Sequence, residues 1–438
     1  MDLTGSHTFR VAACDLNGQM RGKRVPMSYM DKLADGALRM PVSIMNADIF
    51  GADIEASPLV FATGDADGML LPTERGAVPM PWLANPTPLV PMCMHHENGT
   101  PFAGDPRHAL SAILERYKAH GWNVMAATEL EFTLVDDSGE TLRPAPDPRT
   151  GRTMSGAHIL SVDHIDRLDG FFTDLYAGAE AMGIPAQTTT SESGVAQFET
   201  TLTHQDALRA ADDTWLFKAL IRGTARNHSM AATFMAKPFE GDAGNGMHVH
   251  FSVLDQSGQN VFDNGGPDGT EILRAAIAGC LDALVPSTLV FAPHANSYDR
   301  MVPDAHAPTS VCWAYENRTA AIRVPGGAPS ARRIEHRVAG GDTNPYLAFA
   351  AILGAAMTGI EGNLTPPAPM TGNAYDQAFP QLIADWATAT QSFAQDPTMP
   401  GIFHPDLITN LVLTKQQELR LLGDIPKDQH WKTYLDAV

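Results

Sequence analysis

The sequence predicts an α+β fold in two parts, a small β-rich N-terminal domain followed by a larger domain of mixed helices and strands. Short runs typical of strands, broken by Gly, Pro and Asp, extend from Thr8 to about Pro91. Beyond a turn-rich stretch near residue 100, longer helical segments alternate with short strands. The chain has 438 residues, of which 44% are hydrophobic, so it can bury the core that two such domains need.

Strands in the N-terminal part are predicted from the runs FRVAACDL, SPLVFATG and GMLLP, which begin at Phe9, Ser57 and Gly68. Turn-forming residues separate these apolar runs. The stretch HHENGTPFAGDPR, which begins at His95, then contains several turn-forming residues close together. We therefore place a boundary near residue 100 and predict domains over residues 1–100 and 101–438.

Helices in the larger domain are predicted from the spacing of apolar residues. Just after the boundary, four such residues recur at helical intervals and share one face, namely Leu110, Ile113, Leu114 and Tyr117. Ala207–Asn227 and Pro345–Glu361 are two further helical segments, with short strands between them. The sequence shows no internal repeat or low-complexity tract.

The composition of the chain limits the classes of protein to which it can belong. With 50 acidic residues against 30 Lys and Arg, the formal charge is −20, which opposes contact with nucleic acid or anionic lipid. The N-terminal MDLTGSHTFRVAACD lacks the features of a signal peptide, and no stretch approaches the ~18 apolar residues of a membrane span. We therefore expect a cytoplasmic protein that binds neither nucleic acid nor membranes.

The cysteines predict neither a disulfide framework nor a thiolate zinc site. The chain has 4 cysteines, which lie far apart and form no Cys-x-x-Cys pair. We expect reduced, mostly buried thiols. The HHEN sequence that begins at His95 also lacks the second histidine of a zinc-protease helix, because Thr100 occupies that position.

Several predicted strands place polar residues at alternate positions, and such residues share one face of a strand. In ELEF the alternate residues are Glu129 and Glu131. In VAQFET they are Gln197 and Glu199, and Glu192 lies seven residues before Glu199. Each pattern taken alone also fits the solvated face of an antiparallel sheet.

Two further strands add histidines and arginines to this pattern. In MHVHFS the alternate residues are His248, His250 and Ser252. In ARRIEHR they are Arg333, Glu335 and Arg337. Four strands of this kind in one chain fit a solvated surface less easily than a shared polar site.

The glutamates and a histidine on these strands predict a divalent metal site. Closely packed carboxylates repel one another and resist ionisation, whereas a divalent cation reverses both effects. Oxygen-rich ligand sets with a single imidazole suit Mg²⁺ or Mn²⁺ better than zinc or copper, and a catalytic Mg²⁺ usually keeps water and phosphate in its shell. The pattern therefore points to nucleotide phosphate chemistry.

Six motifs, taken in order, carry a resemblance to a known family. They are ELEF, ESGVAQFE, TFMAKPF followed by GNGMHVHFS, NSYDRMVP, ENRTAAIRVP and ARRIEHR. The series resembles glutamine synthetase, and the resemblance covers roughly residues 8 to 360. It implies that DLNGQMRGK and GDADGMLLP belong to a β-grasp domain, and that the larger domain is catalytic, with a curved antiparallel sheet flanked by helices.

The resemblance implies a ligase that uses ATP to join the side-chain carboxylate of glutamate to an amine through γ-glutamyl phosphate. It also implies two or more Mg²⁺ or Mn²⁺ ions in each site. By position, one metal would be held by Glu131, Glu192 and Glu199. The other would be held by Glu129, His248 and Glu335.

The same resemblance implies the remaining site residues. Contacts to ATP are implied for His250, Ser252, Arg323 and Arg333. Glutamate would be bound by Arg300 and Arg337, with the backbone of Gly244 close to it, and Arg318 would face the transferred phosphoryl group. These residue types suit the chemistry, because phosphoryl transfer needs cationic stabilisation and Arg grips carboxylates in a bidentate way.

The amine site departs from the pattern of ammonia-using members. In those enzymes a glutamate of the flap loop helps to bind ammonium, whereas here the loop reads NSYDRMVPDAHAP, with His306 at the matching place. A histidine is mostly neutral at pH 7, so it supplies no fixed negative charge, although it can accept a proton. Relatives with this change resemble γ-glutamylpolyamine and γ-glutamylalkylamide synthetases, so we expect an alkylamine or polyamine substrate. The alternative is ammonia, with His306 a solvated flap residue.

Two other positions leave alternatives open. Ala243 precedes Gly244 where the family often has Asn. Asp48 lies about where a neighbouring subunit of the family supplies an amine-site aspartate, but it fits a turn residue equally well.

Family members share active sites between neighbours in a ring, so we expect a large homo-oligomer of stacked rings, a dodecamer by analogy. A catalytically silent relative that acts as scaffold or sensor is the rival hypothesis, and retention of all the implied metal ligands weighs against it.

Overall fold

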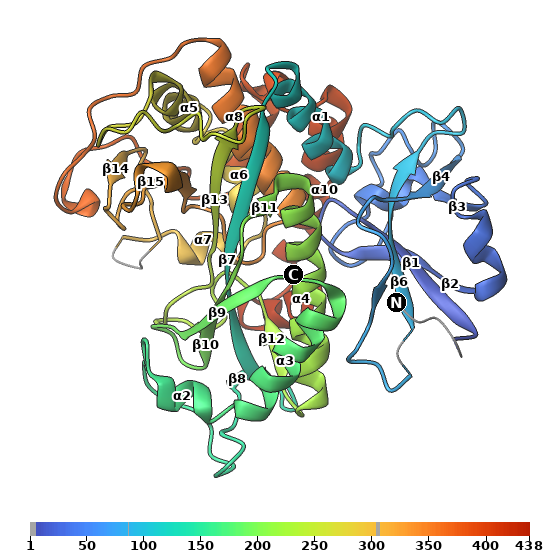
Figure 1. The fold of residues 1–438 in the computed structure, drawn as a ribbon. Helices are drawn as coiled ribbons and strands as arrows, with labels where there is room; N and C mark the ends of the chain where they lie inside the picture. Colours follow the sequence, from blue (N-terminus) through green and yellow to red (C-terminus); the bar gives the residue numbers. More distant parts are fainter. Residues whose placement is uncertain (1–5, 86, 304–306) are drawn as a thin grey trace.

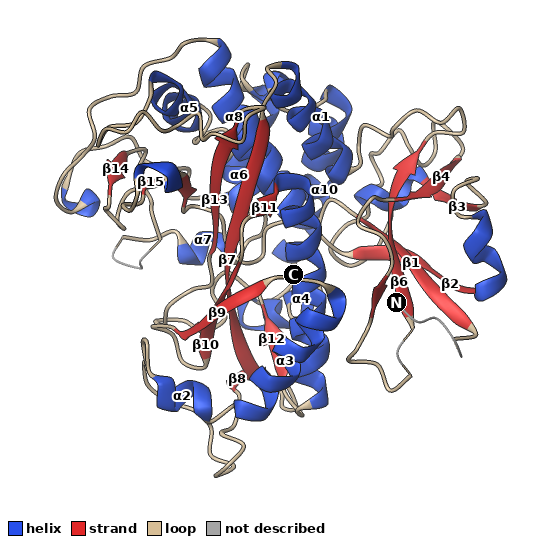
Figure 2. Ribbon diagram, viewed as in Figure 1, coloured by secondary structure: helices blue, strands red, loops and turns tan. Residues whose placement is uncertain are grey.

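The computed structural model describes residues 6–85, 87–303 and 307–438, and it confirms the α+β prediction (Figure 1). Two separate sheets organise the chain. A 6-stranded sheet is built from the N-terminal part, and a 10-stranded sheet is built from the rest. The smaller sheet lies to one side of the larger, helix-covered part in Figure 2. The division into domains at residue 100 remains a prediction.

The N-terminal sheet has the strand order β2-β1-β6-β4-β3, and β5 pairs with β6. Strand β1 forms an antiparallel hairpin with β2 and runs parallel to β6. The 3-10 helices η1 (Met27–Lys32) and η2 (Val42–Asn46) flank β3. The strands are β1 (Thr8–Cys14), β2 (Met20–Pro26), β3 (Leu38–Pro41), β4 (Asp67–Pro72), β5 (Val78–Pro79) and β6 (Pro88–His95).

One predicted strand is wrong. The SPLVFATG run, residues 57–64, forms turns rather than a strand. Local hydrogen bonds satisfy its backbone: Thr63 Oγ1 donates to Leu59 O at 2.7 Å, and Asp65 N donates to Val60 O at 2.7 Å. The run lacks the alternation of a strand, because its buried residues Ser57 and Val60 are three positions apart and all of residues 61–64 are exposed. Local turn formation therefore overrides the strand propensity of the run.

The larger sheet has the order β14-β15-β16-β13-β7-β10-β9, and β8, β11 and β12 also pair with β7. Strand β7 is the longest strand of this sheet and lies at its centre, so residues of β10 and β13 face it from both sides. The strands are β7 (Asn123–Asp136), β8 (Arg143–Pro144), β9 (Ala186–Ser191), β10 (Gln197–Leu202), β11 (Gln205–Asp206), β12 (Ala231–Thr233), β13 (Met247–Leu254), β14 (Trp313–Tyr315), β15 (Ile322–Val324) and β16 (Ile334–His336).

Three predicted helices are confirmed. Helix α4 spans Ala207–Asn227 and α8 spans Pro345–Glu361, as predicted, and α1 (Pro106–Ala119) buries its predicted apolar face. Asp206 and Asn344 cap the first turns of α4 and α8 through their side chains. The other helices are α2 (Val162–Asp166), α3 (Asp169–Met182), α5 (Glu271–Asp282), α6 (Thr288–Phe291), α7 (Ser297–Arg300), α9 (Trp386–Gln395), α10 (Pro405–Gly423) and α11 (His430–Tyr434). The remaining 3-10 helices are η3 (Pro329–Ala331), η4 (Ala374–Asp376), η5 (Met399–Gly401) and η6 (Lys427–Gln429).

Helix α4 fixes which face of the larger sheet is open. Thr128 Oγ1 of β7 lies 2.9 Å from Thr214 Oγ1 of α4, so the even-numbered residues of this part of β7 face the helix. The buried residues Leu130 and Phe132 belong to the same face. Glu129 and Glu131 therefore project from the opposite face, away from α4.

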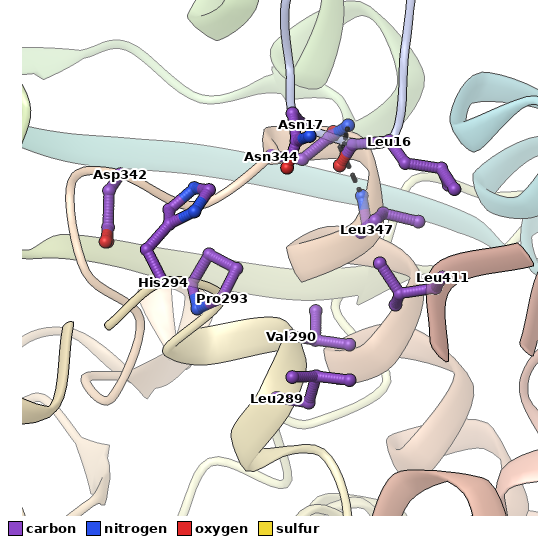
Figure 3. A pocket seen from close by; sticks show the side chains of 10 residues that line it. All are labelled: Leu16, Asn17, Leu289, Val290, Pro293, His294, Asp342, Asn344, Leu347 and Leu411. Carbon is purple, nitrogen blue, oxygen red and sulfur yellow. Dashed lines mark hydrogen bonds between the residues drawn. The ribbon is translucent and has the colours of Figure 1, made fainter. Parts of the chain in front are cut away.

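The N-terminal part joins the larger part through a buried polar cluster and a small apolar gap. Asn17 Nδ2 donates to Glu418 Oε1 of α10 at 2.7 Å, and Lys415 Nζ donates to Glu418 Oε2 at 2.9 Å. Next to this cluster, a cavity of about 10 Å³ lies between Leu16, Asn17 and residues of α6, α8 and α10 (Figure 3). A volume of this size has room for about one water molecule, so it is too small for a substrate.

Two further expectations can be compared with the structure. All four cysteines lie buried as free thiols, as predicted. Within the described residues, none of the helices is long and apolar enough to cross a membrane.

Candidate active site

An open cleft lies on the polar face of the larger sheet. Its volume is about 510 Å³. Side chains from β7, β10 and β13 form its floor, and its walls are formed by loops that follow β8, β9, β12 and β14 and by Arg300 at the end of α7. Its lining includes the predicted site residues Glu129, Glu131, Glu192, Glu199, Gly244, His248, Arg300, Arg318 and Arg337.

Strand pairing brings the predicted metal ligands together. Glu199 of β10 pairs directly with Glu131 of β7, and His248 of β13 pairs directly with Glu129. On the far side of β13, His250 pairs with Glu335 of β16. Directly paired residues on one face have Cβ atoms about 4.5–5.5 Å apart, so these side chains can act on one bound group.

Glu129 lies between two histidines. Its Oε2 is 3.0 Å from His248 Nδ1, and its Oε1 is 3.1 Å from His250 Nε2. Burial by itself disfavours the charged carboxylate, but the hydrogen bond from His248 and the close contact with His250 outweigh that effect and lower the pKa of Glu129. Glu129 is therefore ionised at neutral pH.

Glu335 is fully buried and is held by two arginines. Arg323 Nη1 donates to Glu335 Oε2 at 2.6 Å, and Arg337 donates to the other carboxylate oxygen. Burial opposes the ionisation of Glu335, but the positive charge of Arg337 and the neighbouring His248 bring its pKa down to about 2. This carboxylate also stays charged at neutral pH.

Two other predicted ligands, Glu199 and Glu192, behave in the opposite way. Burial, together with the negative charges of Glu129, Glu131 and Glu192, raises the pKa of Glu199 from 4.5 to about 9. Burial and the charge of Glu131 also raise the pKa of Glu192. One side of the cleft therefore holds carboxylates whose charges are not balanced by the protein alone.

The donor set fits a hard divalent cation. Single ligand atoms of Glu129, Glu199 and His248 lie within 4.8 Å of one another, and so do ligand atoms of Glu129, His250 and Glu335. Mostly carboxylate oxygens with few imidazoles suit Mg²⁺ or Mn²⁺. A cation here would also favour the ionised form of Glu199. The structure thus brings the predicted ligands together, and their division between two metals remains a prediction.

A tight loop beside Glu131 forms the predicted glutamate end of the cleft. Gly246 N donates to Glu131 Oε2 at 2.5 Å, and Arg300 Nη1 donates to Val338 O at 2.8 Å. At Gly244 a Cβ atom would lie 2.2 Å from Ala236 O, so only glycine fits there. The neighbouring Ala243 lines the cleft with a methyl group where an amide was the family expectation.

Asn245 and Gln197 hold this loop in place. Gln197 Nε2 donates to Gly244 O at 2.9 Å and to Asn245 Oδ1 at 3.1 Å. Asn245 Nδ2 in turn donates to Met235 O at 2.9 Å, and its side chain is fully buried. Asn245 is therefore a structural residue of the loop and does not replace the missing amide at position 243.

The residues predicted to contact ATP lie along β13, β15 and the start of β16. Arg333 Nε donates to His250 Nδ1 at 3.3 Å. Arg323 is engaged with Glu335, as described, and Ser252 lies two residues beyond His250 on the same face of β13. These four residues are not part of the cleft lining described above, and their role toward ATP stays a prediction.

Two predicted residues stand apart from the cleft. Both carboxylate oxygens of Asp48 are occupied within the chain, because Oδ1 accepts from Phe50 N at 3.0 Å and Oδ2 accepts from Gln417 Nε2 at 2.8 Å. Asp48 is fully buried in this turn and does not line the cleft of its own chain. His306 lies outside the described residues.

The cleft also contains residues that the sequence did not reveal. Ile159 and Leu160 line it, although both are apolar and are 59% and 68% exposed. Leu160 has φ 57°, a left-handed conformation that is strained for a bulky residue, and its N–H donates to Ser191 O at 2.7 Å. The only sequence signal was the placement of an apolar pair in a loop.

Tyr375 is a second lining residue whose place the sequence could not fix. Its hydroxyl donates to Ala307 O at 2.8 Å, next to the flap segment that carries residue 306. The segment around Tyr375 thus contacts the flap and also closes one wall of the cleft.

Comparisons with known proteins find similarity along nearly the whole chain. A family model described as "Glutamine synthetase, catalytic domain" matches residues 103–434. The chain is 36% identical over 373 residues to the γ-glutamylputrescine synthetase PuuA of Escherichia coli strain K12, which covers 84% of this chain and 78% of that protein. It is 30% identical over 441 residues to a glutamate–isopropylamine ligase of a Pseudomonas species, covering 98% and 95% of the two chains. The solved structure of a GmaS–ADP complex is similar with a TM-score of 0.84, 26% identity and 99% coverage of both chains.

Proposed function

Because the chain belongs to the glutamine synthetase family, we propose that it joins the γ-carboxylate of glutamate to an alkylamine or polyamine, with hydrolysis of ATP to ADP and phosphate. It is an ATP-dependent ligase that forms a C–N bond. Two of the relatives described above are named for amine substrates that carry carbon, putrescine and isopropylamine. The observation that carries the choice of amine lies in the cleft itself.

That observation is the exposed apolar pair in the lining of a mostly polar cleft. Ile159 and Leu160 expose hydrocarbon in the same cleft that Glu192 and Arg318 line. Ammonium has no apolar surface to bury on such residues, whereas each CH₂ of an alkylamine buried there contributes ~0.8 kcal/mol. Leu160 has a left-handed backbone conformation, which is unfavourable for a leucine. Backbone strain of this kind is typical of binding sites.

The chemistry follows from the residues that line the cleft. A carboxylate is a poor electrophile, so the γ-carboxylate of glutamate must first accept the γ-phosphoryl group of ATP to give an acyl phosphate. Arg300, Arg337 and the backbone at Gly244 would hold glutamate, while Arg318 would stabilise the charge on the transferred group. Divalent cations, when bound to the carboxylates, supply further positive charge for this transfer. The amine then attacks the acyl carbon and phosphate leaves.

The amine enters as a cation with a pKa near ~10 and must lose a proton before it attacks. We assign the acceptance of this proton to His306, from the sequence of the flap. A neutral imidazole there can act as a base without providing the fixed negative charge that would favour ammonium. This assignment rests on sequence alone.

Further proposals concern the metals, the cellular location and the assembly of the enzyme. We propose Mg²⁺ or Mn²⁺ as its metals, a cytoplasmic location, and a homo-oligomer of stacked rings in which Asp48 contributes to a neighbour's amine site. Exposed apolar side chains in the N-terminal part, such as Phe50 and Phe61, offer surface for subunit contacts. Light scattering coupled to size exclusion would give the mass of the assembly, and a monomeric enzyme with full activity would refute the shared site.

The alternative is ammonia as substrate, which would make the protein a glutamine-forming enzyme. The test is a measurement of kcat/KM for phosphate release with glutamate, ATP and a panel of amines at fixed pH. We expect at least one small alkylamine or polyamine to exceed ammonium. If ammonium exceeds every amine of the panel, glutamine formation replaces the proposal. If no amine supports turnover, the rival hypothesis of a silent relative stands instead.

A further inference from the structure

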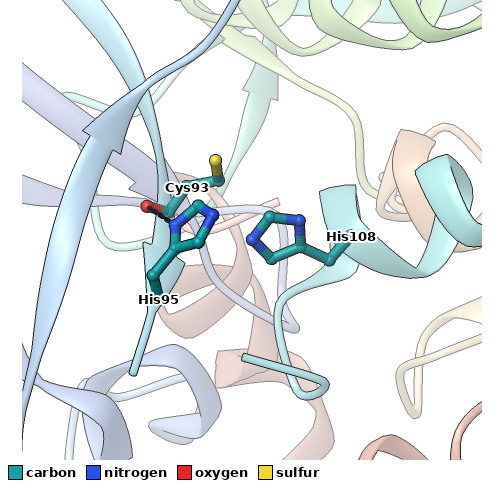
Figure 4. Close-up of side chains that lie close together, drawn as sticks. All are labelled: Cys93, His95 and His108. Carbon is teal, nitrogen blue, oxygen red and sulfur yellow. Dashed lines mark hydrogen bonds between the residues drawn. The ribbon is translucent and has the colours of Figure 1, made fainter. Parts of the chain in front are cut away.

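A second cluster of metal-binding side chains lies outside the cleft. Cys93 and His95 are two residues apart near the end of β6, and His108 lies in the first turn of α1. One ligand atom of each residue lies within 4.8 Å of those of the other two. The His95 and His108 rings meet edge to face, with 4.7 Å between their centroids. Figure 4 shows the thiol and the two rings converging from the strand and the helix.

The backbone of β6 orients both imidazoles. His95 Nδ1 lies 3.4 Å from Cys93 O, and His108 Nε2 lies 2.9 Å from Met94 O. Within the described residues, the other nitrogen of each ring makes no hydrogen bond. Histidines that bind metals commonly have one nitrogen at a backbone carbonyl and the other at the metal. His95 is held in this way, whereas the His108 nitrogen that faces His95 in Figure 4 is Nε2, so His108 would exchange its contact with Met94 O for the metal.

Burial sets the protonation states of the cluster before any metal binds. Burial, followed by the charge of His108, lowers the pKa of His95, so its ring is neutral at pH 7 and can donate a lone pair. Burial raises the pKa of the Cys93 thiol to about 12. The thiol therefore keeps its proton until a metal replaces it. Cys93 itself is 6% exposed, whereas both rings are partly exposed and leave a path from solvent.

We propose that Cys93, His95 and His108 form a site for a borderline-soft divalent cation, with Zn²⁺ the best match, separate from the carboxylate cleft. One sulfur and two imidazole nitrogens suit Zn²⁺ or Co²⁺ and do not suit Mg²⁺. Binding releases the thiol proton to solvent and forms a thiolate–metal bond. Water completes the tetrahedral set.

The geometry requires only a small adjustment. Metal–ligand lengths of about 2.0–2.3 Å place tetrahedral ligands about 3.5 Å apart. The separations, which are within 4.8 Å, therefore have to shorten by at most about 1.3 Å, which side-chain rotation can provide. The bound ion would tie the end of β6 to the start of α1, across the segment that connects the N-terminal sheet to the larger part.

The sequence did not predict this site, because the cysteines form no Cys-x-x-Cys pair and His108 lies on a different element. The HHEN sequence that begins at His95 does not match a zinc-protease motif. Only its first histidine enters the cluster, while the second, His96, packs edge to face on Phe102.

The test uses the full-length protein, stripped of metal and then kept in excess Mg²⁺ so that Mg²⁺ occupies the carboxylate cleft. Titration with Zn²⁺ against a chromophoric chelator should show one Zn²⁺ held per chain, and Co²⁺ should give the near-ultraviolet charge-transfer band of a cobalt–thiolate bond. Cys93→Ser and His108→Asn should weaken Zn²⁺ binding by about 10–100-fold, and Cys93→Ser should abolish the band. Cys280→Ser and His96→Ala are matched controls outside the cluster and should retain both signals.

Each other outcome overturns the site. Wild-type affinity in Cys93→Ser would place the ion elsewhere. Binding that Glu131→Gln removes but Cys93→Ser preserves would place it in the carboxylate cleft. If Cys93→Ser does not fold, alkylation of Cys93 in the wild-type protein decides the question. Zn²⁺ should protect this thiol at least about tenfold, as expected for a thiolate bound to metal, and an unchanged rate contradicts the proposal.

Discussion

His248 Nδ1 lies 3.0 Å from Glu129 Oε2, at directly paired positions of β13 and β7. The pair joins two strands whose residues are far apart in the sequence, and both residues line the acidic cleft. Its geometry makes the predicted metal ligands one interdependent set, because a change in one alters the charge that the others experience.

Removal of one ligand charge should therefore abolish most activity. We predict that Glu131→Gln or Glu335→Gln lowers turnover at least about a hundredfold, as loss of a metal ligand should. The measurement is kcat at saturating glutamate, ATP and Mn²⁺. Glu97→Gln, an exposed residue paired with Arg39, is the control and should leave turnover unchanged. Full activity in both cleft variants, or in wild-type protein with excess chelator, would falsify the metal prediction.

Glu199→Gln should lower activity but stabilise the protein in chelator. The folded-state pKa of Glu199 is raised from 4.5 to about 9, so its stabilising contribution is fully present below pH 4.5 and is lost as the pH rises toward 9. The glutamine imitates the protonated acid and does not titrate. We expect the variant to gain on the order of 1–2 kcal/mol over wild type near pH 8 and almost nothing near pH 5. Thermal unfolding of both proteins across this range measures the difference, and a gain that does not depend on pH would contradict it.

Arg300 should determine the affinity for glutamate. Its guanidinium is buried beside the Gly244 loop, and lysine cannot reproduce a bidentate grip on a carboxylate. We predict that Arg300→Lys raises KM for glutamate at least about tenfold while KM for ATP changes little. Arg274→Lys, on the surface of α5, is the control. An unchanged glutamate KM removes the assignment.

The apolar pair should discriminate between alkylamines and ammonium. In Leu160→Asn, the asparagine tolerates the left-handed conformation, but the apolar contact is lost. We predict about a tenfold lower kcat/KM for the preferred alkylamine, equivalent to about two buried methylenes, and little change for ammonium. Val162→Asn is matched in exposure, at 69%, but does not line the cleft, so it should behave as wild type. Equal losses for both substrates would mean that Leu160 only shapes the loop.

His306 provides an independent test of the amine preference. We predict that His306→Glu shifts the ratio of kcat/KM values back toward ammonium, because it restores a fixed negative charge that attracts the small cation. His306→Gln keeps a polar side chain without charge or basicity and serves as the comparison. If the glutamate variant keeps the wild-type ratio, the flap histidine does not select the amine.

Structural features that depend on local residue periodicity could be predicted from the sequence. Glu129 and Glu131 share a face because the side-chain period of a strand is two, and α4 follows from one helical segment with a capping residue at its start. The pairing of His248 with Glu129 could not be predicted from periodicity, because register depends on contacts between distant segments. Resemblance to a family supplied that grouping in advance.

What remained hidden lies in loops and between elements. Leu160 enters the cleft through a loop conformation that no periodic pattern encodes, and the cluster of Cys93 with His108 forms only when α1 packs beside β6. SPLVFATG was predicted wrongly, because its composition favours a strand while local hydrogen bonds favour turns. Each of these cases is decided by contacts outside the short window that a motif covers.

The central place of β7 sets the order in which the protein can mature. Its carboxylates meet His248 only when β13 pairs with it, and they meet Glu335 only when β16 has joined β13. During synthesis the acidic set therefore cannot assemble until residue 335 has left the ribosome, by which time most of the 438 residues have been made. A nascent chain released before residue 335 carries an incomplete set of predicted ligands, and one released before β13 also leaves one edge of the central strand unpaired. Premature termination before residue 335 should thus yield aggregation-prone fragments rather than partly active enzyme.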